Sequence, residues 1–394
     1  MIRLLIPCLF CLATSVVASA QAPIQKWIDE AIKAGGGVVT IPPGEHVLPA
    51  GLLIKDAKKL ALRGLEREQC VLKLPPLAYA ESAGPAVVGS TRLKVRAARG
   101  WKPGMRLHLE ADGDVDSFTG KPRPYVLAVI EKVLEDEFLL KEPMKHPIAA
   151  GTVIRHEDAP NLIEIRGACE TIELTNLVLD GGRVDGDPPV QGHAQLCGVF
   201  ASGQYGYEKG PTGPKPRDIT VRDCILQNFF GRGVAFYSVV NAGVERCSIR
   251  DCNDEAVDFD HFTEEAVAAD NRITRCRIAF ELNDAIKCLV RGNEVSDCGL
   301  GLSLWRWCRQ PGLNEGNVVR SNSFRNIQGN AIQVATGTAK NRFEGNEIEG
   351  AGRNGISLSG SGQVLRGNRI QDVKLKPLVV NEGEHDIQDS ASGK

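Results

Sequence analysis

The chain has 394 residues, a formal net charge of -2, only 5% aromatic residues and as many as 42 glycines. A glycine-rich, aromatic-poor chain of this length is typical of a β protein with many turns rather than of a helical protein. The lack of a basic excess argues against a nucleic-acid partner. No apolar segment after the N-terminal leader is long enough to span a bilayer.

The first twenty residues have the pattern of a secretory signal. One arginine is followed by an apolar run that ends in Ala18-Ser19-Ala20, which fits a signal-peptidase site. We therefore expect residues 1–20 to be removed and the mature protein to be exported, to the periplasm or the extracellular space. A short membrane anchor is the alternative, and the shortness of the apolar run argues against it.

Residues 21–90 are predicted to form an N-terminal cap and the first coils of a repeat structure. Apolar residues between Ile24 and Ile32 recur at helical spacing, and the three glycines at residues 35–37 would end that helix. A strand and a turn follow over residues 38–48. An amphipathic helix in this place would cover the open apolar end of a solenoid.

Residues 91–158 interrupt this organisation. They contain apolar runs joined by turns, and these runs do not follow the spacing of the later repeat. We predict a small inserted β subdomain here, without an assigned role. Its strands are expected at residues 104–110, 125–134, 137–142 and 151–157.

The segment 159–380 repeats itself. A short motif of small or polar residues followed by an apolar one, such as GNEI or GNRI, recurs along this segment. Its second residues are separated by 23, 24, 22, 29, 24 and 22 positions, and they are Cys224, Cys247, Asn271, Asn293, Asn322, Asn346 and Asn368. A short apolar pair precedes each motif, and an alternating strand follows it. Three short strands in about 23 residues make one coil of a parallel β-helix, whose units bury their apolar faces against each other. A leucine-rich repeat is the main alternative, but its leucine spacing is missing.

Two segments differ from the regular coils. Residues 181–216 form a glycine- and proline-rich excursion around one strand, and such loops on a rigid scaffold commonly wall a binding groove. Residues 381–394 are predicted to be a polar C-terminal tail.

Ten of the twelve cysteines follow the leader. Ten cysteines in an exported protein suggest disulfide bonds. However, Cys252, Cys276 and Cys298 occupy the same position in successive coils, where side chains stack about 4.8 Å apart. This spacing admits a disulfide, but the repeat favours a ladder of buried thiols.

The helix, the AGGGVVTIPPGEH segment at residues 34–46 and the later Gly-Asn-x-apolar coils resemble secreted right-handed parallel β-helix proteins of the pectin-lyase-like superfamily. The resemblance covers residues 23–380 apart from the insert. It implies an all-β, right-handed parallel β-helix of about 23 residues per coil, with an N-terminal capping helix and a small inserted β subdomain. It also implies an activity among the polysaccharide lyases, uronan epimerases and glycoside hydrolases that act on acidic polymers.

Two subgroups of that superfamily can be compared residue by residue. Polygalacturonase-like hydrolases carry Asn-Thr-Asp, Asp-Asp and Gly-His-Gly on consecutive coils, where this chain has Asn253-Asp254, Asn283-Asp284 and Gly299-Leu300-Gly301. Leucine replaces the histidine and no later Arg-x-Lys pair is evident, so the hydrolase pattern is incomplete. Alginate epimerase-like proteins carry Asp-Pro-His-Asp, and Asp258-Phe259-Asp260-His261 has similar components in a different order.

The strand around residues 255–260 carries much negative charge. Asp258 and Asp260 alternate with apolar residues, so both carboxylates lie on the face opposite the core. Aligning the coils places Asp258 over Glu281, and places Asp260 over Asn283. The predicted catalytic residues are Asp258, Asp260, His261, Glu281 and Asp284.

Carboxylates this close repel one another, and two arrangements relieve the repulsion. One carboxyl can keep its proton at neutral pH and act as a general acid beside a base. Alternatively, Ca²⁺ can bind Asp258, Asp260 and Glu281, hold a uronate carboxylate and stabilise charge as the α-proton leaves. The spacing between coils is compatible with both the short and the long carboxyl separation found in glycosidases, so the spacing alone does not identify the reaction.

Aromatic and basic residues flank the carboxylates. The predicted substrate-binding residues are Tyr237 and Trp305 for the sugar rings and Lys287, Arg306 and Arg309 for an anionic sugar's carboxylates. We expect a monomeric lyase or epimerase whose partner is an acidic polysaccharide. A glycoside hydrolase, and a non-catalytic glycan-binding or surface-structural solenoid, are the alternatives.

Overall fold

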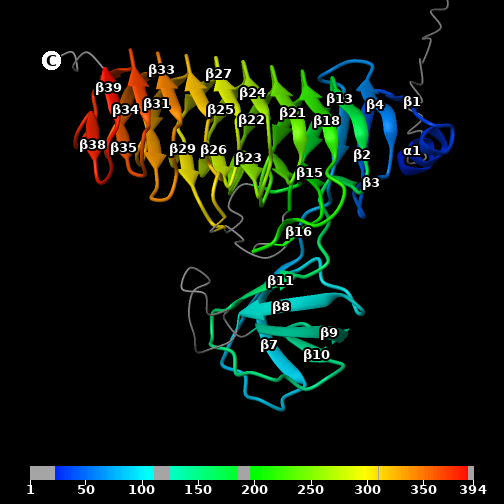
Figure 1. Ribbon diagram of the computed structural model, residues 1–394. Coiled ribbons are helices and arrows are strands. Elements are labelled where there is room, and N and C mark those ends of the chain that lie inside the picture. The colour runs from blue at the N-terminus through cyan, green and yellow to red at the C-terminus, as the bar shows by residue number, and fades with distance from the viewer. Residues whose placement is uncertain (1–22, 111–124, 185–195, 207, 309, 389–394) are drawn as a thin grey trace, which may run out of the picture.

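The computed structural model describes residues 23–110, 125–184, 196–206, 208–308 and 310–388, so the predicted leader lies outside the described residues. Three long parallel sheets run along one solenoid, and a separate barrel projects from its side (Figure 1). Each coil contributes one strand to each sheet, and consecutive coils pair strand upon strand. The predicted parallel β-helix is confirmed.

All three sheets of the solenoid are parallel. Sheet 1 consists of β3 (Leu52–Lys55), β12 (Ile163–Arg166), β15 (Val199–Ser202), β20 (Val234–Tyr237), β23 (Glu255–Asp260), β26 (Ile278–Asn283), β29 (Leu300–Trp305), β32 (Ile332–Val334), β35 (Ile356–Leu358) and β38 (Leu378–Val380). Sheet 2 consists of β1 (Gly37–Ile41), β4 (Lys58–Gly64), β13 (Glu170–Thr175), β18 (Arg217–Arg222), β21 (Val240–Glu245), β24 (Val267–Ala269), β27 (Leu289–Arg291), β30 (Val318–Arg320), β33 (Arg342–Glu344), β36 (Val364–Arg366) and β39 (Asp386–Gln388). Sheet 3 consists of β2 (Gly44–Val47), β5 (Cys70–Lys73), β14 (Val178–Asp180), β19 (Ile225–Gln227), β22 (Ser248–Arg250), β25 (Arg272–Thr274), β28 (Glu294–Ser296), β31 (Ser323–Ile327), β34 (Glu347–Ala351) and β37 (Arg369–Gln371).

One helix, α1 (Ile24–Lys33), covers the N-terminal end of the solenoid, as predicted (Figure 1). Ile24 and Ile28 are buried in the solenoid core, and Trp27 packs beside them. The helix ends before a glycine turn in which Gly36 has a φ of 125°, and a Cβ there would lie 2.5 Å from the carbonyl oxygen of Lys58. Only glycine fits this close approach.

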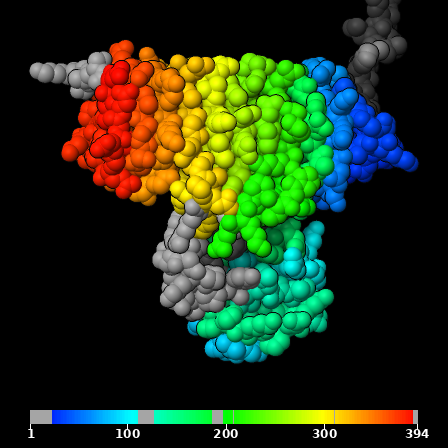
Figure 2. Space-filling model, in the orientation of Figure 1, coloured from blue at the N-terminus to red at the C-terminus, as the bar shows by residue number. Residues whose placement is uncertain are grey.

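The inserted subdomain is a closed six-stranded barrel. Its strands are β6 (Tyr79–Ser82), β7 (Arg92–Arg99), β8 (Arg106–Glu110), β9 (Tyr125–Val133), β10 (Glu137–Leu140) and β11 (Val153–His156). The barrel has its own apolar core, which includes Leu93, Ile130 and Phe138. Figure 2 shows it as a compact body attached to the side of the rod-shaped solenoid.

Two predicted boundaries differ from the structure. The barrel begins at Tyr79 rather than at residue 91, because the apolar segment around Ala86 pairs with Ile148 in the barrel and not with a coil. A short apolar run has the same pattern in either place. At the other end, β39 pairs with β36, so the solenoid extends to Gln388 and into the predicted tail.

Stacked side chains inside the solenoid explain the repeated motif. The Nδ2 of Asn322 donates to the carbonyl of Val290 and to Oδ1 of Asn346, both at 3.0 Å. Each asparagine of the stack before the last thus bonds the backbone of one coil and the side chain of the next, which satisfies buried amides. The stack consists of Asn271, Asn293, Asn322, Asn346 and Asn368.

The ten described cysteines are all buried free thiols. Three thiols, each just after a sheet 3 strand of successive coils, contact one another as a ladder: Cys252, Cys276 and Cys298. The structure therefore shows the thiol ladder that the repeat favours.

The excursion at residues 181–216 contains β15 and a small hairpin. The hairpin pairs β16 (Tyr205–Gly206) with β17 (Gly210–Pro211). It lies beside sheet 1, because Tyr205 packs against Tyr237 at the end of β20.

Candidate functional site

The acidic strand β23 and its neighbour β26 are buried along their whole length. Asp258, Asp260 and Glu281 are 0%, 4% and 8% exposed. The register pairs Asp258 with Glu281 and Tyr237 with Asp260, as predicted from the repeat. Burial removes water from these charges, so neighbouring groups decide their protonation. We call Asp254, Glu255, Asp258, Asp260, Glu281 and Asp284 the acidic cluster.

Arg232 is the positive centre of the acidic cluster, and the sequence-based prediction missed it. Its Nε lies 2.7 Å from Oε2 of Glu255 and 2.8 Å from Oδ2 of Asp258, and a terminal nitrogen lies 3.5 Å from Oδ2 of Asp254. Its guanidinium also lies 5.9 Å from the ring centre of Tyr237. Three carboxylates thus share one largely buried arginine, which offsets part of their charge.

Arg277 lies at the outer edge of the acidic cluster. Its Nε donates to Asp254 at 2.8 Å, and a terminal nitrogen donates to Glu255 at 2.7 Å. Its side chain is 48% exposed, so this guanidinium reaches solvent while it binds half-buried Asp254 and buried Glu255. Burial alone would raise the pKa of Asp254, but Arg232 and Arg277 outweigh it and lower that pKa.

Two carboxyl groups of the acidic cluster have a pKa near neutrality. Burial, assisted by the charge of Glu281 and opposed by Arg232, raises the pKa of Glu255 to about 8. Burial and the charge of Asp258 raise the pKa of Glu281 to about 7. Burial and the charge of Asp260 hold the pKa of Asp258 well above its ordinary value. Glu255 and Glu281 can therefore gain and lose protons at neutral pH, as acid–base catalysts must.

The other end of the acidic cluster is organised around His261. Its Nδ1 lies 3.1 Å from Oδ1 of Asp260 and 3.6 Å from Oδ2 of Asp284. The carboxylate of Asp284 accepts hydrogen bonds from the backbone N–H groups of Trp307 at 2.9 Å and Cys308 at 3.0 Å. The structure thus brings three predicted residues together and adds Cys308, which was not predicted.

Aromatic rings cover this end of the cluster. Tyr205 and Tyr237 each have a ring centre 5.0 Å from that of His261, and Tyr237 meets the imidazole edge-on. Tyr237, predicted to face a sugar, is only 4% exposed. Tyr205 comes from the excursion that was expected to wall a groove, and in this structure it packs on the site.

Trp305, predicted as a sugar-stacking platform, contacts the acidic cluster directly. Its Nε1 donates to Oε1 of Glu281 at 2.8 Å, and this bond opposes the rise in the pKa of Glu281. Its half-buried ring meets that of Trp307 edge-on at 5.6 Å. Trp305 therefore both borders the site and tunes one of its carboxyls.

The predicted basic residues do not contribute an ion pair to the acidic cluster within the described part of the chain. The guanidinium of Arg306 donates to the backbone carbonyls of Cys308 at 2.7 Å and Gly337 at 3.3 Å, so it supports a loop. Lys287 is exposed at the turn before β27. Arg309 lies outside the described residues.

The predicted calcium ligands are Asp258, Asp260 and Glu281. Arg232 places its Nε 2.8 Å from Asp258, so an arginine supplies at that carboxylate the charge that a cation would supply. Asp258 therefore does not fit the role of a calcium ligand well. A calcium site at these three residues stays a prediction.

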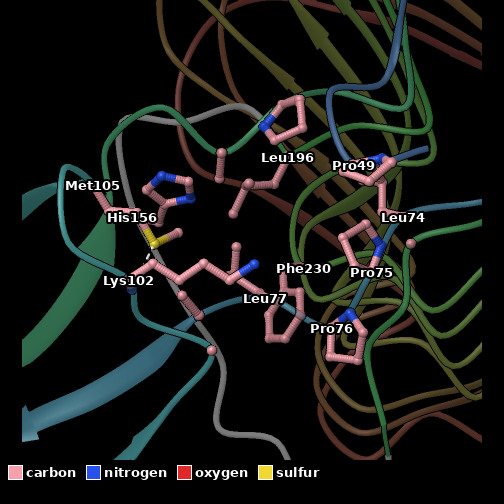
Figure 3. Close-up of a pocket in the computed structure, with 15 residues that line it drawn as sticks. Pro49, Leu74, Pro75, Pro76, Leu77, Lys102, Met105, His156, Leu196 and Phe230 are labelled. Carbon is pink, nitrogen blue, oxygen red and sulfur yellow. Dashed lines mark hydrogen bonds between the residues drawn. The ribbon is translucent and has the colours of Figure 1, made fainter. Parts of the chain in front are cut away.

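A separate cavity of about 350 Å³ lies where the barrel meets the solenoid (Figure 3). Pro75 and Phe230 line its solenoid side, and Met105 and His156 line its barrel side. Its described lining contains no carboxylate, and burial lowers the pKa of His156. Since this cavity lacks paired acid and base groups, the acidic cluster is the better candidate for chemistry.

A family model described as a right handed beta helix region matches residues 192–370, which include every residue of the acidic cluster. The chain is a right-handed parallel β-helix protein. Comparison of this β-helix protein with curated proteins found no significant match in sequence. No helix among its described residues is long and apolar enough to cross a membrane.

Solved structures share the fold of this β-helix protein at low sequence identity. The A-module of mannuronan C-5 epimerase AlgE4 from Azotobacter vinelandii has a TM-score of 0.52 and 15% identity, over 95% of this chain and 96% of that chain. A fragment of bacteriophage Phi29 gene product 12 has a TM-score of 0.56 and 11% identity, over 93% of this chain and 63% of that chain. A double mutant of the periplasmic alginate epimerase AlgG has a TM-score of 0.51 and 11% identity, over 91% of this chain and 78% of that chain. These identities show the fold alone.

Proposed function

We propose that this β-helix protein is an exported enzyme that acts on an acidic, uronate-containing glycan, as a lyase or an epimerase, through the acidic cluster. One observation carries the proposal: Asp258 and Glu281 are paired on adjacent coils beside the largely buried Arg232, and the pKa of Glu281 is about 7. A carboxyl that titrates near neutral pH next to fixed positive charge is suited to proton transfer.

Both reactions begin with the loss of the proton on the carbon that bears the uronate carboxylate. Ionised Glu281 is the base in this proposal, because it is the most exposed carboxylate of β23 and β26. Arg277 binds the uronate carboxylate and stabilises the electron pair left on the sugar. In an epimerase a proton returns to the same carbon from the opposite face. In a lyase the neighbouring glycosidic C–O bond breaks, the leaving oxygen takes a proton, and a double bond remains.

The fold neighbours support the substrate class. Two of them are named as epimerases of mannuronan and of alginate, and the second is named as periplasmic. They share the solenoid fold, and this chain places its acidic cluster on one sheet of that solenoid. We extend a polysaccharide partner and export to this chain on these grounds, and we expect a monomer.

Two other functions each have an observation in their favour. A glycoside hydrolase would use the pairing of Asp258 with Glu281, since adjacent strands about 4.8 Å apart admit the carboxyl separation of a retaining enzyme. A non-catalytic glycan-binding or structural solenoid would explain why Asp258 is fully buried and why Tyr205 packs over His261.

The test is an assay of residues 21–394 on a panel of uronic-acid polysaccharides, with added Ca²⁺ or with a chelator. Ultraviolet absorbance of the unsaturated product together with new reducing ends identifies a lyase, and new reducing ends alone identify a hydrolase. A change of sugar configuration by NMR without new ends identifies an epimerase. Glycan affinity without any of these products would leave the non-catalytic function.

Glu281→Gln is the variant that assigns the activity to the acidic cluster. It keeps the shape and removes the titrating group, so turnover should fall at least about a hundredfold, as for the loss of a general base. Glu294→Gln, on the exposed side of sheet 3, is the matched control and should keep full activity. Equal activity of the two variants would remove Glu281 from the mechanism.

A further inference from the structure

Three different donor atoms converge at the His261 end of the site. His261, Asp284 and Cys308 each offer one ligand atom, and these atoms all lie within 4.8 Å of one another. The three residues come from separate parts of the chain, after β23, after β26 and after β29. All three are buried, at 6%, 0% and 4% exposure. A nitrogen, an oxygen and a sulfur donor therefore meet in one enclosed place.

The donor set favours a zinc-type ion over calcium. Calcium takes six to eight oxygen ligands, whereas imidazole, carboxylate and thiolate are the ligands of zinc. Zinc bonds of about 2.0–2.3 Å in a tetrahedron place ligand atoms roughly 3.3–3.8 Å apart. His261 Nδ1 and Asp284 Oδ2 are 3.6 Å apart, inside that interval. A further oxygen donor, Oδ1 of Asp260, lies 3.1 Å from the same nitrogen.

The surrounding structure holds these side chains in place. Backbone N–H groups of Trp307 and Cys308 bind the carboxylate of Asp284. The backbone of His261 has a φ of 39°, a left-handed conformation that few side chains adopt, and Tyr205 packs on its ring. Partners that orient ligands in this way are usual around metal sites.

The charge of this end of the cluster supplies an independent argument. Arg232 and Arg277 form ion pairs with Asp254, Glu255 and Asp258. Among the described residues, the ion pairs of Asp260 and Asp284 run only to His261. Buried carboxylates require a compensating positive charge. A divalent ion bound at this place supplies positive charge beside both carboxylates.

We propose that His261, Asp284 and Cys308 bind a zinc-type divalent transition-metal ion, beside Asp260. On binding, the sulfur–metal bond forms and the thiol proton of Cys308 passes to solvent, so metal uptake releases a proton. The ion ties the segments after β23, β26 and β29 together at the edge of the acidic cluster. This inference does not depend on the proposed glycan activity.

The test uses the whole mature protein, kept reduced, stripped with a chelator and then titrated with Zn²⁺ and with Co²⁺. We expect one equivalent of zinc by elemental analysis and a sulfur-to-cobalt charge-transfer band, which only a bound thiolate produces. Cys308→Ser and His261→Gln should each weaken metal binding at least about tenfold, and Cys308→Ser should lose the band. Cys298→Ser, which changes another buried thiol, should keep both the metal and the band.

Circular dichroism before metal addition shows whether each variant is folded, and the two ligand variants test the site separately. Stripped wild-type protein that takes up no stoichiometric zinc would overturn the proposal. So would a folded Cys308→Ser variant that binds zinc as tightly as wild type. Neither readout involves a glycan, so failure here is distinct from failure of the proposed enzyme activity.

Discussion

Arg232 and Asp258 form an ion pair of 2.8 Å in which the carboxylate is fully buried and the arginine side chain is 18% exposed. Arg232 lies just before β20, and Asp258 lies in the strand that pairs with β20 on the next coil. The same guanidinium also binds Glu255, which is 1% exposed. One side chain therefore compensates two carboxylates that water does not reach.

Replacing this arginine should destabilise the fold strongly. Arg232→Gln leaves buried Asp258 without its ion-pair partner and leaves Glu255 paired with Arg277 alone, which costs about 3–5 kcal/mol of the free energy of unfolding. Urea denaturation at neutral pH measures the change. Arg275→Gln is the control, because Arg275 binds Asp251 at 2.8 Å on the exposed surface, where a pair contributes at most about 1 kcal/mol. Similar losses in both variants would contradict the central role of Arg232.

Stability should decrease as the pH rises through neutrality. The pKa values of Glu255 and Glu281 are raised from an ordinary 4.5 to about 8 and about 7, so the folded state binds more protons than the unfolded state in this range. Below pH 4.5 these protons make their full contribution to the free energy of unfolding. This contribution is lost as the pH rises through the folded-state pKa values of about 7 and about 8. At about 1.4 kcal/mol for each pKa unit, the loss is on the order of several kcal/mol.

Urea denaturation at a series of pH values measures this slope. Glu255→Gln combined with Glu281→Gln removes both titrating groups and should flatten the curve, whereas Glu294→Gln should leave it unchanged. A double variant with the wild-type slope would show that other groups cause the pH dependence.

Trp305 should control the protonation of Glu281. Trp305→Phe removes the indole donor at 2.8 Å that favours the ionised carboxylate, so the pKa of Glu281 should rise above about 7. NMR titration of side-chain carboxyl carbons would follow it directly. Trp307→Phe changes the neighbouring ring, which is 38% exposed, and should leave that pKa in place. An unchanged or lower value in Trp305→Phe would exclude this tuning.

The asparagine stack should contribute to stability through its hydrogen bonds. Asn322→Ala removes donors to Val290 and Asn346 and an acceptor for Asn293, so buried groups lose their partners. We expect a loss of at least about 2 kcal/mol in the free energy of unfolding. Gln388→Ala, at an exposed strand on the last coil, should change it by less than about 0.5 kcal/mol. A loss no larger than that of the control would mean that the stack is dispensable.

The repeat period was sufficient to predict the fold and much of the register. Because each coil adds a near-constant number of residues, the motif from Asn271 to Asn368 predicted the stacking of coils, and the same arithmetic paired Asp258 with Glu281. The barrel boundary escaped prediction, since a short apolar run such as the one at Ala86 fits a coil and a barrel equally well.

Arg232 could have been found from the same register. Val234 pairs with Val257, so the residues two positions earlier, Arg232 and Glu255, fall beside one another. It was missed because Arg232 precedes its strand, outside the alternating pattern that drew the prediction to Asp258 and Asp260. Arg306 is the opposite case: it follows a strand next to the site, but its long side chain turns to backbone carbonyls.

The amino-acid sequence by itself determined the solenoid, its capping helix, the stacked interior and the carboxylates that share one face, because all of these follow from periodicity along the chain. Only the tertiary structure decided that those carboxylates are buried, which arginines compensate them and that Cys308 reaches His261 and Asp284. These properties depend on side chains far apart in the chain, such as Tyr205 packed on His261. The protonation of these carboxyl groups depends on their burial and on charged neighbours, and neither of these recurs at a fixed spacing along the sequence.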